Sequence, residues 1–140
     1  MKRIYDFSRS PSARNYTVAD LQALKGSDKK LSMSNPKDAT EVQACIDAGI
    51  DLMVVSASQI EEVRRVAPHH FVGVGSTWSQ FGKAEDILEH AFDMMRKGGD
   101  MYYTLRSLEV MEMLSKEGIP VQSHIGLIPT FSHWCGGLCG

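Results

Sequence analysis

Four polar side chains that could bind a small anion stand close to the ends of predicted strands. Ser58 and Ser76 each follow an apolar run, Arg106 follows the fourth run, and His124 lies at the end of the fifth. A serine at a helix N-terminus can bind an anion together with backbone N–H groups, and a guanidinium pairs with a carboxylate in a fork geometry. The competing interpretations are plain helix caps, an exposed loop arginine and a hydrogen-bonded core histidine. The residue types alone leave these alternatives open.

Clusters that could bind a metal are weak in this sequence. Cys135 and Cys139 form a C-x₃-C pair with only His133 nearby, whereas a closed zinc site needs four ligands. The paired acids at 61–62 and 85–86 fall on predicted helix surfaces, near the positive ends of the helix dipoles. The residues therefore predict no metal site, and the role of Cys135 and Cys139 stays open.

The composition argues against several classes of partner. The 140 residues are 43% hydrophobic and 23% charged, with a net charge of −2, as in an ordinary globular domain. Scattered basic pairs and a slightly negative charge argue against a nucleic-acid surface. No apolar run approaches the ~20 residues of a membrane span, and residues 1–16 contain no signal peptide. We therefore expect a cytoplasmic protein without nucleic-acid or membrane partners.

Five apolar runs of strand type alternate with amphipathic segments of helix type. The expected strands are residues 30–34, 51–56, 71–75, 101–105 and 119–125, and the expected helices are 17–25, 35–48, 58–66, 84–97 and 107–116. Asn35 is the predicted cap of the second helix, and residues 1–16 are expected to form a flexible arm. The alternation predicts a parallel α/β sheet with outer helices. Five units cannot close an eight-stranded barrel, so an open sheet and a partial barrel remain as alternatives.

Several stretches of sequence favour the partial barrel. They are DAGIDLMVVSAS at 47–58, VRRVAP at 63–68, the segment 84–101 and SHIGLIP at 123–129. Together they resemble ketopantoate hydroxymethyltransferase, a family of the phosphoenolpyruvate-binding barrel group. The similarity runs from about residue 29 to residue 140 and covers only the family's N-terminal part. It implies that residues 17–140 form the first five units of a (β/α)₈, or TIM, barrel.

The resemblance also implies an activity and a set of site residues. The family transfers a hydroxymethyl group from methylenetetrahydrofolate to a small 2-oxo acid, 3-methyl-2-oxobutanoate, in pantothenate biosynthesis. His124 matches a family histidine that precedes Gly-Leu and Pro, so we expect a catalytic role for it. Ser58 matches the serine of a family Asp-Ser pair. Ser58, Ser76 and Arg106 are the expected substrate-binding residues.

The family's metal-binding acids are replaced in this chain. Ala57, Gly75 and Leu105 stand at the aligned positions. Mg²⁺, which chelates the 2-oxo acid in the family and acts as a Lewis acid, prefers carboxylate oxygens that these side chains lack. Magnesium is therefore doubtful, and whether the chain is an active enzyme stays open. The alternative is a truncated, non-catalytic half barrel acting as a binding or assembly module, whose open sheet edges predict a homo-oligomer.

Overall fold

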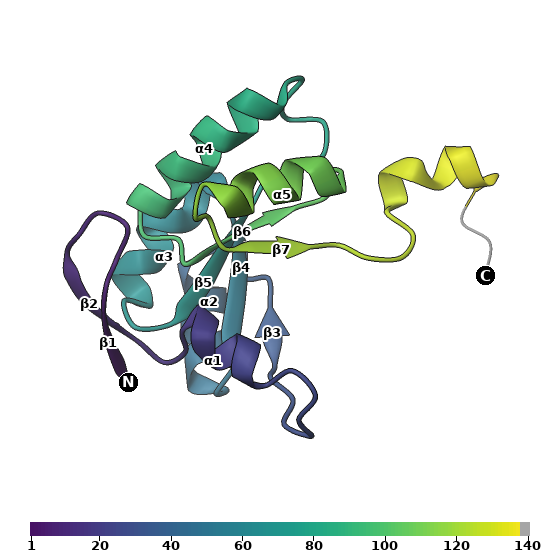
Figure 1. Cartoon of the computed structure of the whole chain (residues 1–140). Coiled ribbons are helices and arrows are strands. Elements are labelled where there is room, and N and C mark those ends of the chain that lie inside the picture. The colour runs from purple at the N-terminus through teal and green to yellow at the C-terminus, as the bar shows by residue number, and fades with distance from the viewer. Residues whose placement is uncertain (138–140) are drawn as a thin grey trace.

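Five parallel strands form the centre of the fold, in the order in which they occur along the chain (Figure 1). The computed structural model describes residues 1–137. The strands are β3 (Met33–Ser34), β4 (Leu52–Ser56), β5 (Phe71–Gly75), β6 (Met101–Thr104) and β7 (Val121–Ser123). Each pairs in parallel with the next. The predicted parallel α/β fold is confirmed, and β5 has the predicted bounds, whereas the outer strands are shorter than predicted.

Helices follow the strands and pack on one side of the sheet. They are α2 (Ala39–Asp47), α3 (Ile60–Val66), α4 (Ala84–Arg96) and α5 (Leu108–Lys116), and a 3₁₀ turn at Ala57–Gln59 precedes α3. The prediction that Asn35 caps α2 is wrong. Asp38 is the cap, and its carboxylate accepts a hydrogen bond of 2.8 Å from the Glu41 N–H. Asn35 instead donates its side-chain amide to the Val54 carbonyl at 3.3 Å.

The two faces of the sheet are packed differently because successive side chains of a strand point to opposite sides. The face beneath α2 to α5 carries the larger core, which includes Met53, Val55, Val72, Val74 and Tyr102. The opposite, inner face carries a smaller cluster of Val54, Phe71 and Met101, packed against residues of α1 (Val18–Ala23). Helix α1 lies within the expected helix 17–25, and its N-cap is Thr17, whose capping box with Asp20 is complete.

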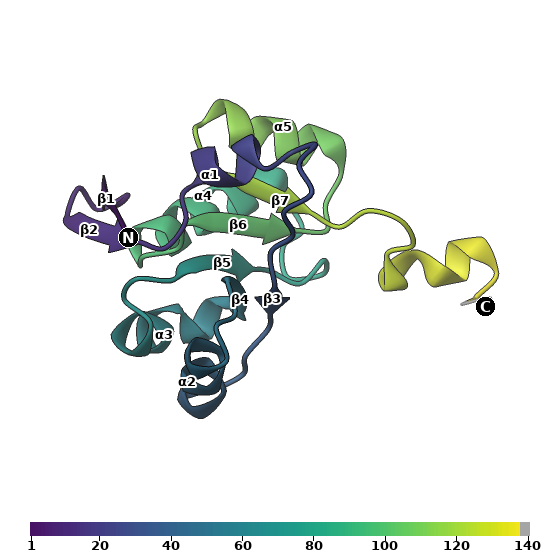
Figure 2. The same cartoon turned by 90° about the horizontal axis from the view of Figure 1, so that it is seen from below.

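The sheet is strongly curved. Figure 2 shows the strands following an arc with β3 and β7 at its two ends. The side chains at the ends approach each other, since Gln122 Nε2 of β7 lies 3.9 Å from Met33 Sδ of β3. A curved parallel sheet with helices on its outer side is the arrangement expected for part of a barrel.

Residues 1–16, predicted as a flexible arm, contain an antiparallel hairpin of β1 (Lys2–Tyr5) and β2 (Pro11–Arg14). Arg14 anchors it, because its side chain is 3% exposed and Nε lies 2.8 Å from the Asp100 carboxylate at the start of β6. The boundary between an arm and the barrel units at residue 17, and the mobility of the arm, stay predictions.

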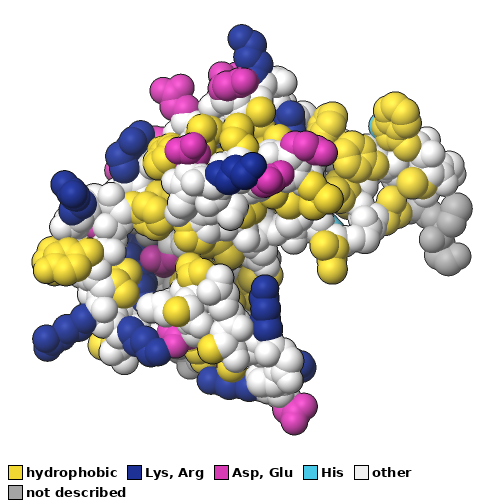
Figure 3. Space-filling view, in the orientation of Figure 1, with side chains coloured by type: hydrophobic (Ala, Val, Ile, Leu, Met, Phe, Trp, Pro, Cys, Tyr) yellow, Lys and Arg dark blue, Asp and Glu magenta, His cyan; other side chains and the backbone are white. Residues whose placement is uncertain are grey.

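The segment after β7 leaves the body of the molecule and ends in a 3₁₀ helix, Pro129–Cys135, that the sequence did not predict. It carries apolar side chains that remain exposed, among them Ile125, Leu127 and Trp134. Apolar groups gather along this projection in Figure 3. No helix within residues 1–137 is long and apolar enough to cross a membrane.

Candidate functional site

An open hollow of about 530 Å³ lies at the C-terminal ends of β4, β5 and β6. Its polar lining comes from the last parts of β4 and β6, from the segments after β3, β4 and β5, and from the C-terminal projection: Asn35, Lys37, Ser56, Gln59, Ser76, Thr77, Ser79, Tyr103 and Thr130. In barrels and open parallel sheets, ligands bind outside the carboxyl ends of the strands. This hollow is therefore the candidate site.

A tyrosine–histidine pair lies at its edge. Tyr103, which lines the hollow, has its hydroxyl 3.0 Å from Nδ1 of the half-buried His124. His124 does not itself line the hollow, so it reaches the site through Tyr103. The pair can pass a proton or present a hydroxyl donor, depending on the tautomer of the imidazole.

Ser76 lies in the wall of the hollow. It is 8% exposed, and its N–H donates to the Tyr103 carbonyl at 3.3 Å. The backbone N–H is thus occupied by the sheet, which leaves the hydroxyl as the group of Ser76 that can contact a ligand.

Arg106 does not line the hollow but holds the loop that contains Trp78 and Phe81. Its Nη1 donates to the carbonyls of Phe81 at 2.7 Å and Trp78 at 3.5 Å, and its guanidinium lies 5.9 Å from the centre of the Trp78 ring. The Trp78 ring also meets Phe131 edge-on at 5.4 Å. Arg106 therefore positions Trp78, which lines the hollow, and links the loop to the C-terminal projection.

Ser58 is separate from the other predicted residues. It is exposed in the 3₁₀ turn and does not line the hollow, and its neighbour Ala57 packs against the outer core. At the end of β4, the residues that line the hollow are instead Ser56 and Gln59, and the Ser56 N–H donates to Gln59 Oε1 at 3.0 Å. The structure thus gathers Ser76, Arg106 and His124 around one site and leaves Ser58 outside it.

Sequence reasoning missed several lining residues. Asn35, Lys37, Trp78, Tyr103 and Thr130 were not predicted as site residues. Asn35 and Lys37 could have been predicted because they directly follow β3. Ser76 was selected by the same rule, that ligand-binding residues follow the C-terminal ends of the strands. Thr130 is brought in by a segment without periodicity, so its sequence carries no such signal.

The lining favours an anion over a metal. Lys37 contributes a positive charge, and none of the described residues that line the hollow is Asp or Glu. Gly75 and Leu105 line it where relatives were expected to carry metal-binding acids. Hydroxyl, amide and ammonium groups do not fit Mg²⁺, which is usually held by carboxylates. Within residues 1–137, no cluster of three or more His, Cys, Asp and Glu side chains could hold a metal ion. Cys139 of the C-x₃-C pair lies outside the described residues.

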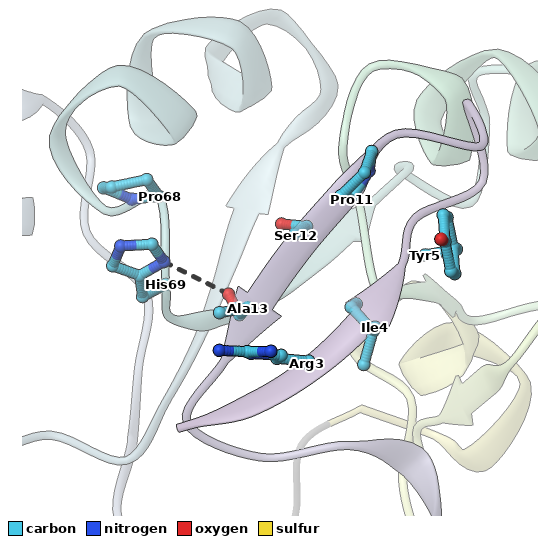
Figure 4. A pocket seen from close by; sticks show the side chains of 8 residues that line it. All are labelled: Arg3, Ile4, Tyr5, Pro11, Ser12, Ala13, Pro68 and His69. Carbon is cyan, nitrogen blue, oxygen red and sulfur yellow. Dashed lines mark hydrogen bonds between the residues drawn. The ribbon is translucent and has the colours of Figure 1, made fainter.

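A second hollow, of about 690 Å³, lies between the hairpin and the loop before β5 (Figure 4). Arg3 and His69 are among its lining residues, and His69 Nδ1 lies 3.3 Å from the Ala13 carbonyl. This hollow is beside the N-terminal end of β5, whereas function in such folds is found at the C-terminal end. We assign no site to it.

Curated proteins similar to this chain include hydroxymethyltransferases. No family model matches the chain. The 3-methyl-2-oxobutanoate hydroxymethyltransferase of Photorhabdus laumondii is 26% identical over 145 residues, covering 86% of this chain and 55% of its own. That of Desulfotalea psychrophila is 28% identical over 147 residues, covering 86% and 53%. The predicted resemblance is confirmed. The chain spans about half the length of the curated relatives it matches.

A solved structure supports the architecture. The crystal structure of 2,3-dimethylmalate lyase, a PEP mutase/isocitrate lyase superfamily member, aligns with a TM-score of 0.58 over 77% of this chain and 52% of its own. At 12% sequence identity this likeness shows the fold alone. It confirms the predicted partial (β/α)₈ barrel.

Proposed function

We propose that the hollow binds a small 2-oxo acid and serves a hydroxymethyl transfer or a related aldol-type reaction. The observation that carries the proposal is the hollow's lining of hydroxyls and one lysine, free of acids among the described residues, at the functional end of the strands. Its support is the similarity to enzymes named for 3-methyl-2-oxobutanoate. By this similarity, methylenetetrahydrofolate is the proposed one-carbon donor, and pantothenate biosynthesis the proposed context.

Each polar group has a role in this proposal. Lys37 and the Ser76 hydroxyl hold the carboxylate of the acid, because an ammonium and an O–H both donate to it. Tyr103 donates its hydroxyl to the keto oxygen, and His124, 3.0 Å from that hydroxyl, exchanges the proton. Arg106 acts indirectly by holding the loop that carries Trp78. No step is assigned to Mg²⁺, since the lining does not fit it.

Fluorescence of Trp78 can report the binding of 3-methyl-2-oxobutanoate, and calorimetry checks it. The full chain is titrated with and without Mg²⁺, beside Tyr103→Phe and a control, Tyr5→Phe, whose residue is 77% exposed on the hairpin. A hydrogen bond to a neutral carbonyl oxygen contributes about 0.5–1.5 kcal/mol, so Tyr103→Phe should weaken binding by about two- to tenfold if its hydroxyl bonds the keto oxygen. The control should bind like the wild type. Absence of saturable binding, or equal affinities of wild type and Tyr103→Phe, would contradict the proposal.

The open edges of the sheet favour a second candidate function, as an assembly module. Among residues 1–137, β3 and β7 each have a strand partner on one side only, and the projection beyond β7 exposes Ile125, Leu127 and Trp134. Unpaired strand edges are templates for association with another chain. Light scattering after size exclusion, over a roughly tenfold concentration range, measures the mass. A defined homo-oligomer that binds no 2-oxo acid would favour this candidate, and a monomer would contradict it.

A further inference from the structure

The side chain of Gln59 joins the loops that follow β3 and β4. Gln59 ends the 3₁₀ turn after β4 and lines the hollow beside Ser56. Its Oε1 accepts from the Ser56 N–H at 3.0 Å, and its Nε2 donates to the carbonyl of Lys37 in the loop between β3 and α2. One amide group therefore connects the end of β4 to the residue that contributes a positive charge to the hollow.

The two contacts require an amide, because one atom must accept a hydrogen bond and the other must donate one. A carboxylate at position 59 could still accept from the Ser56 N–H, but it would face the Lys37 carbonyl with a second acceptor. An amide turned by half a rotation would place its oxygen against the Lys37 carbonyl and its nitrogen against the Ser56 N–H. The two partners thus fix the orientation of the Gln59 amide.

The loop that carries Lys37 is also held by its own helix. The Lys37 N–H donates to Oε2 of Glu41 at 2.8 Å, and the Asp38 carboxylate caps α2 by accepting from the Glu41 N–H at 2.8 Å. Gln59 adds a contact from the neighbouring strand–helix unit, to the peptide group between Lys37 and Asp38. Since Lys37 is exposed, loss of this contact would let the peptide group rotate towards solvent.

We propose that Gln59 is a positioning residue of the anion site, whose amide fixes the peptide group after Lys37 and so keeps the Lys37 ammonium beside the hollow. A lysine ammonium sits on a flexible four-carbon stem, so a fixed backbone limits the volume that the ammonium can reach. Ordering before binding raises affinity, because less conformational entropy is lost when the ligand binds. The choice of a 2-oxo acid as the anion rests on the proposed function, whereas the contact between Gln59 and Lys37 does not.

NMR relaxation on the full chain tests the contact without a ligand. The Asp38 N–H lies in the same peptide plane as the Lys37 carbonyl, so its order parameter reports the mobility of that group. Gln59→Glu keeps the shape of the side chain but removes the donor, and the Asp38 order parameter should fall from about 0.85 towards about 0.6. The matched control is Gln43→Glu, because Gln43 lies on α2, does not line the hollow, and donates to Asp47 Oδ1 at 2.8 Å. The control should keep the wild-type value.

Calorimetry with 3-methyl-2-oxobutanoate tests the effect on binding. Gln59→Met removes both polar contacts without adding charge and should weaken binding by about two- to tenfold, as for the loss of one neutral hydrogen bond. Gln43→Met should bind like the wild type. In a Lys37→Met background, Gln59→Met should change the affinity by less than about twofold, because the positioned ammonium is gone. A residue that only stabilised the fold would weaken binding equally in both backgrounds.

The outcomes separate the two proposals. An unchanged Asp38 order parameter in Gln59→Glu, as expected if Gln59 acted through Ser56 alone, or an equal loss of affinity in both Lys37 backgrounds, would overturn the positioning role. If the order parameter falls but the wild type binds no 2-oxo acid, the positioning contact is supported and the proposed function is contradicted. Where Lys37→Met binds too weakly to measure, the order parameter decides. Circular dichroism of each variant detects general loss of structure.

Discussion

The buried guanidinium of Arg64 should contribute more to the free energy of unfolding than any other charged side chain of α3. It donates to the carbonyls of Ala67 at 3.1 Å and His70 at 2.7 Å, to the Gly98 carbonyl, and to the Asp100 carboxylate. The Arg64 side chain is 13% exposed, and burial lowers its pKa although Asp100 opposes the shift. The guanidinium thus connects α3 to the loop before β5 and the loop before β6.

Arg64→Met keeps much of the side-chain volume but removes all of these bonds. Breaking a buried ion pair by deleting one partner costs about 3–5 kcal/mol. Asp100 keeps Arg14 at 2.8 Å and the Val72 N–H at 2.9 Å, so we expect a loss near the lower end, about 3 kcal/mol. Small domains have free energies of unfolding of about 5–15 kcal/mol, so the variant should still fold.

Urea denaturation followed by circular dichroism measures the loss. With a slope of about 1–3 kcal/mol per molar urea, the midpoint of Arg64→Met should fall by about 1–3 M. The matched control is Arg65→Met, because the neighbouring arginine is exposed and such substitutions change stability by about 0.5 kcal/mol or less. Equal midpoints for the two variants would refute the reasoning that the buried network stabilises the fold.

Three further predictions concern the inner face, helix α1 and the hollow. Gly73→Ala would place a Cβ 2.5 Å from Met101 Cε, the flexible end of that side chain, and 3.2 Å from Val54 Cγ2. We therefore expect a loss near the lower end of the overpacking range, about 1 kcal/mol, in urea denaturation, and an unchanged midpoint would contradict it. The pKa of Asp20 is lowered to about 2, chiefly by its lysine partner; its charge therefore supports the α1 cap fully above its ordinary 3.8 and loses this role as the pH falls towards 2. A midpoint near 3.8 in an NMR titration would disprove this. Gly75→Asp combined with Leu105→Glu should create Mn²⁺ binding, detectable by electron paramagnetic resonance, that the Asn and Gln counterparts lack; equal binding by both pairs would count against carboxylates as the missing ligands.

The fold could be predicted from the sequence wherever a unit repeats a simple pattern. Buried runs such as 71–75 give strands, and Thr17 and Ser107 are found at the caps of α1 and α5. The hairpin was missed because only one of its residues, Arg14, is buried, so no apolar alternation marks it. The cap at Asp38 was missed because Asn35-Pro36 satisfies the same local rule, and only the contact of Asn35 with Val54 decides between them.

The site was predictable only in part. The rule that ligands bind after the strands selects Ser76 and Arg106. It does not predict that Nη1 of Arg106 donates to loop carbonyls. The Tyr103–His124 contact joins positions 21 residues apart, and it depends on how adjacent strands align. Thr130 reaches the hollow from a segment whose sequence predicts no element. Such contacts between distant residues are properties of the assembled fold.

The contact between Arg14 and Asp100 has a consequence for biosynthesis. The two residues are 86 positions apart, whereas each strand of the sheet pairs with the next one along the chain. Units can therefore dock one after another as they emerge from the ribosome, but the hairpin, made first, waits for its carboxylate. At about 5–20 residues per second, this delay is roughly 4–17 s. During that interval the start of the chain remains available to chaperones and proteases, and the contact can form only once Asp100, directly before β6, has been made.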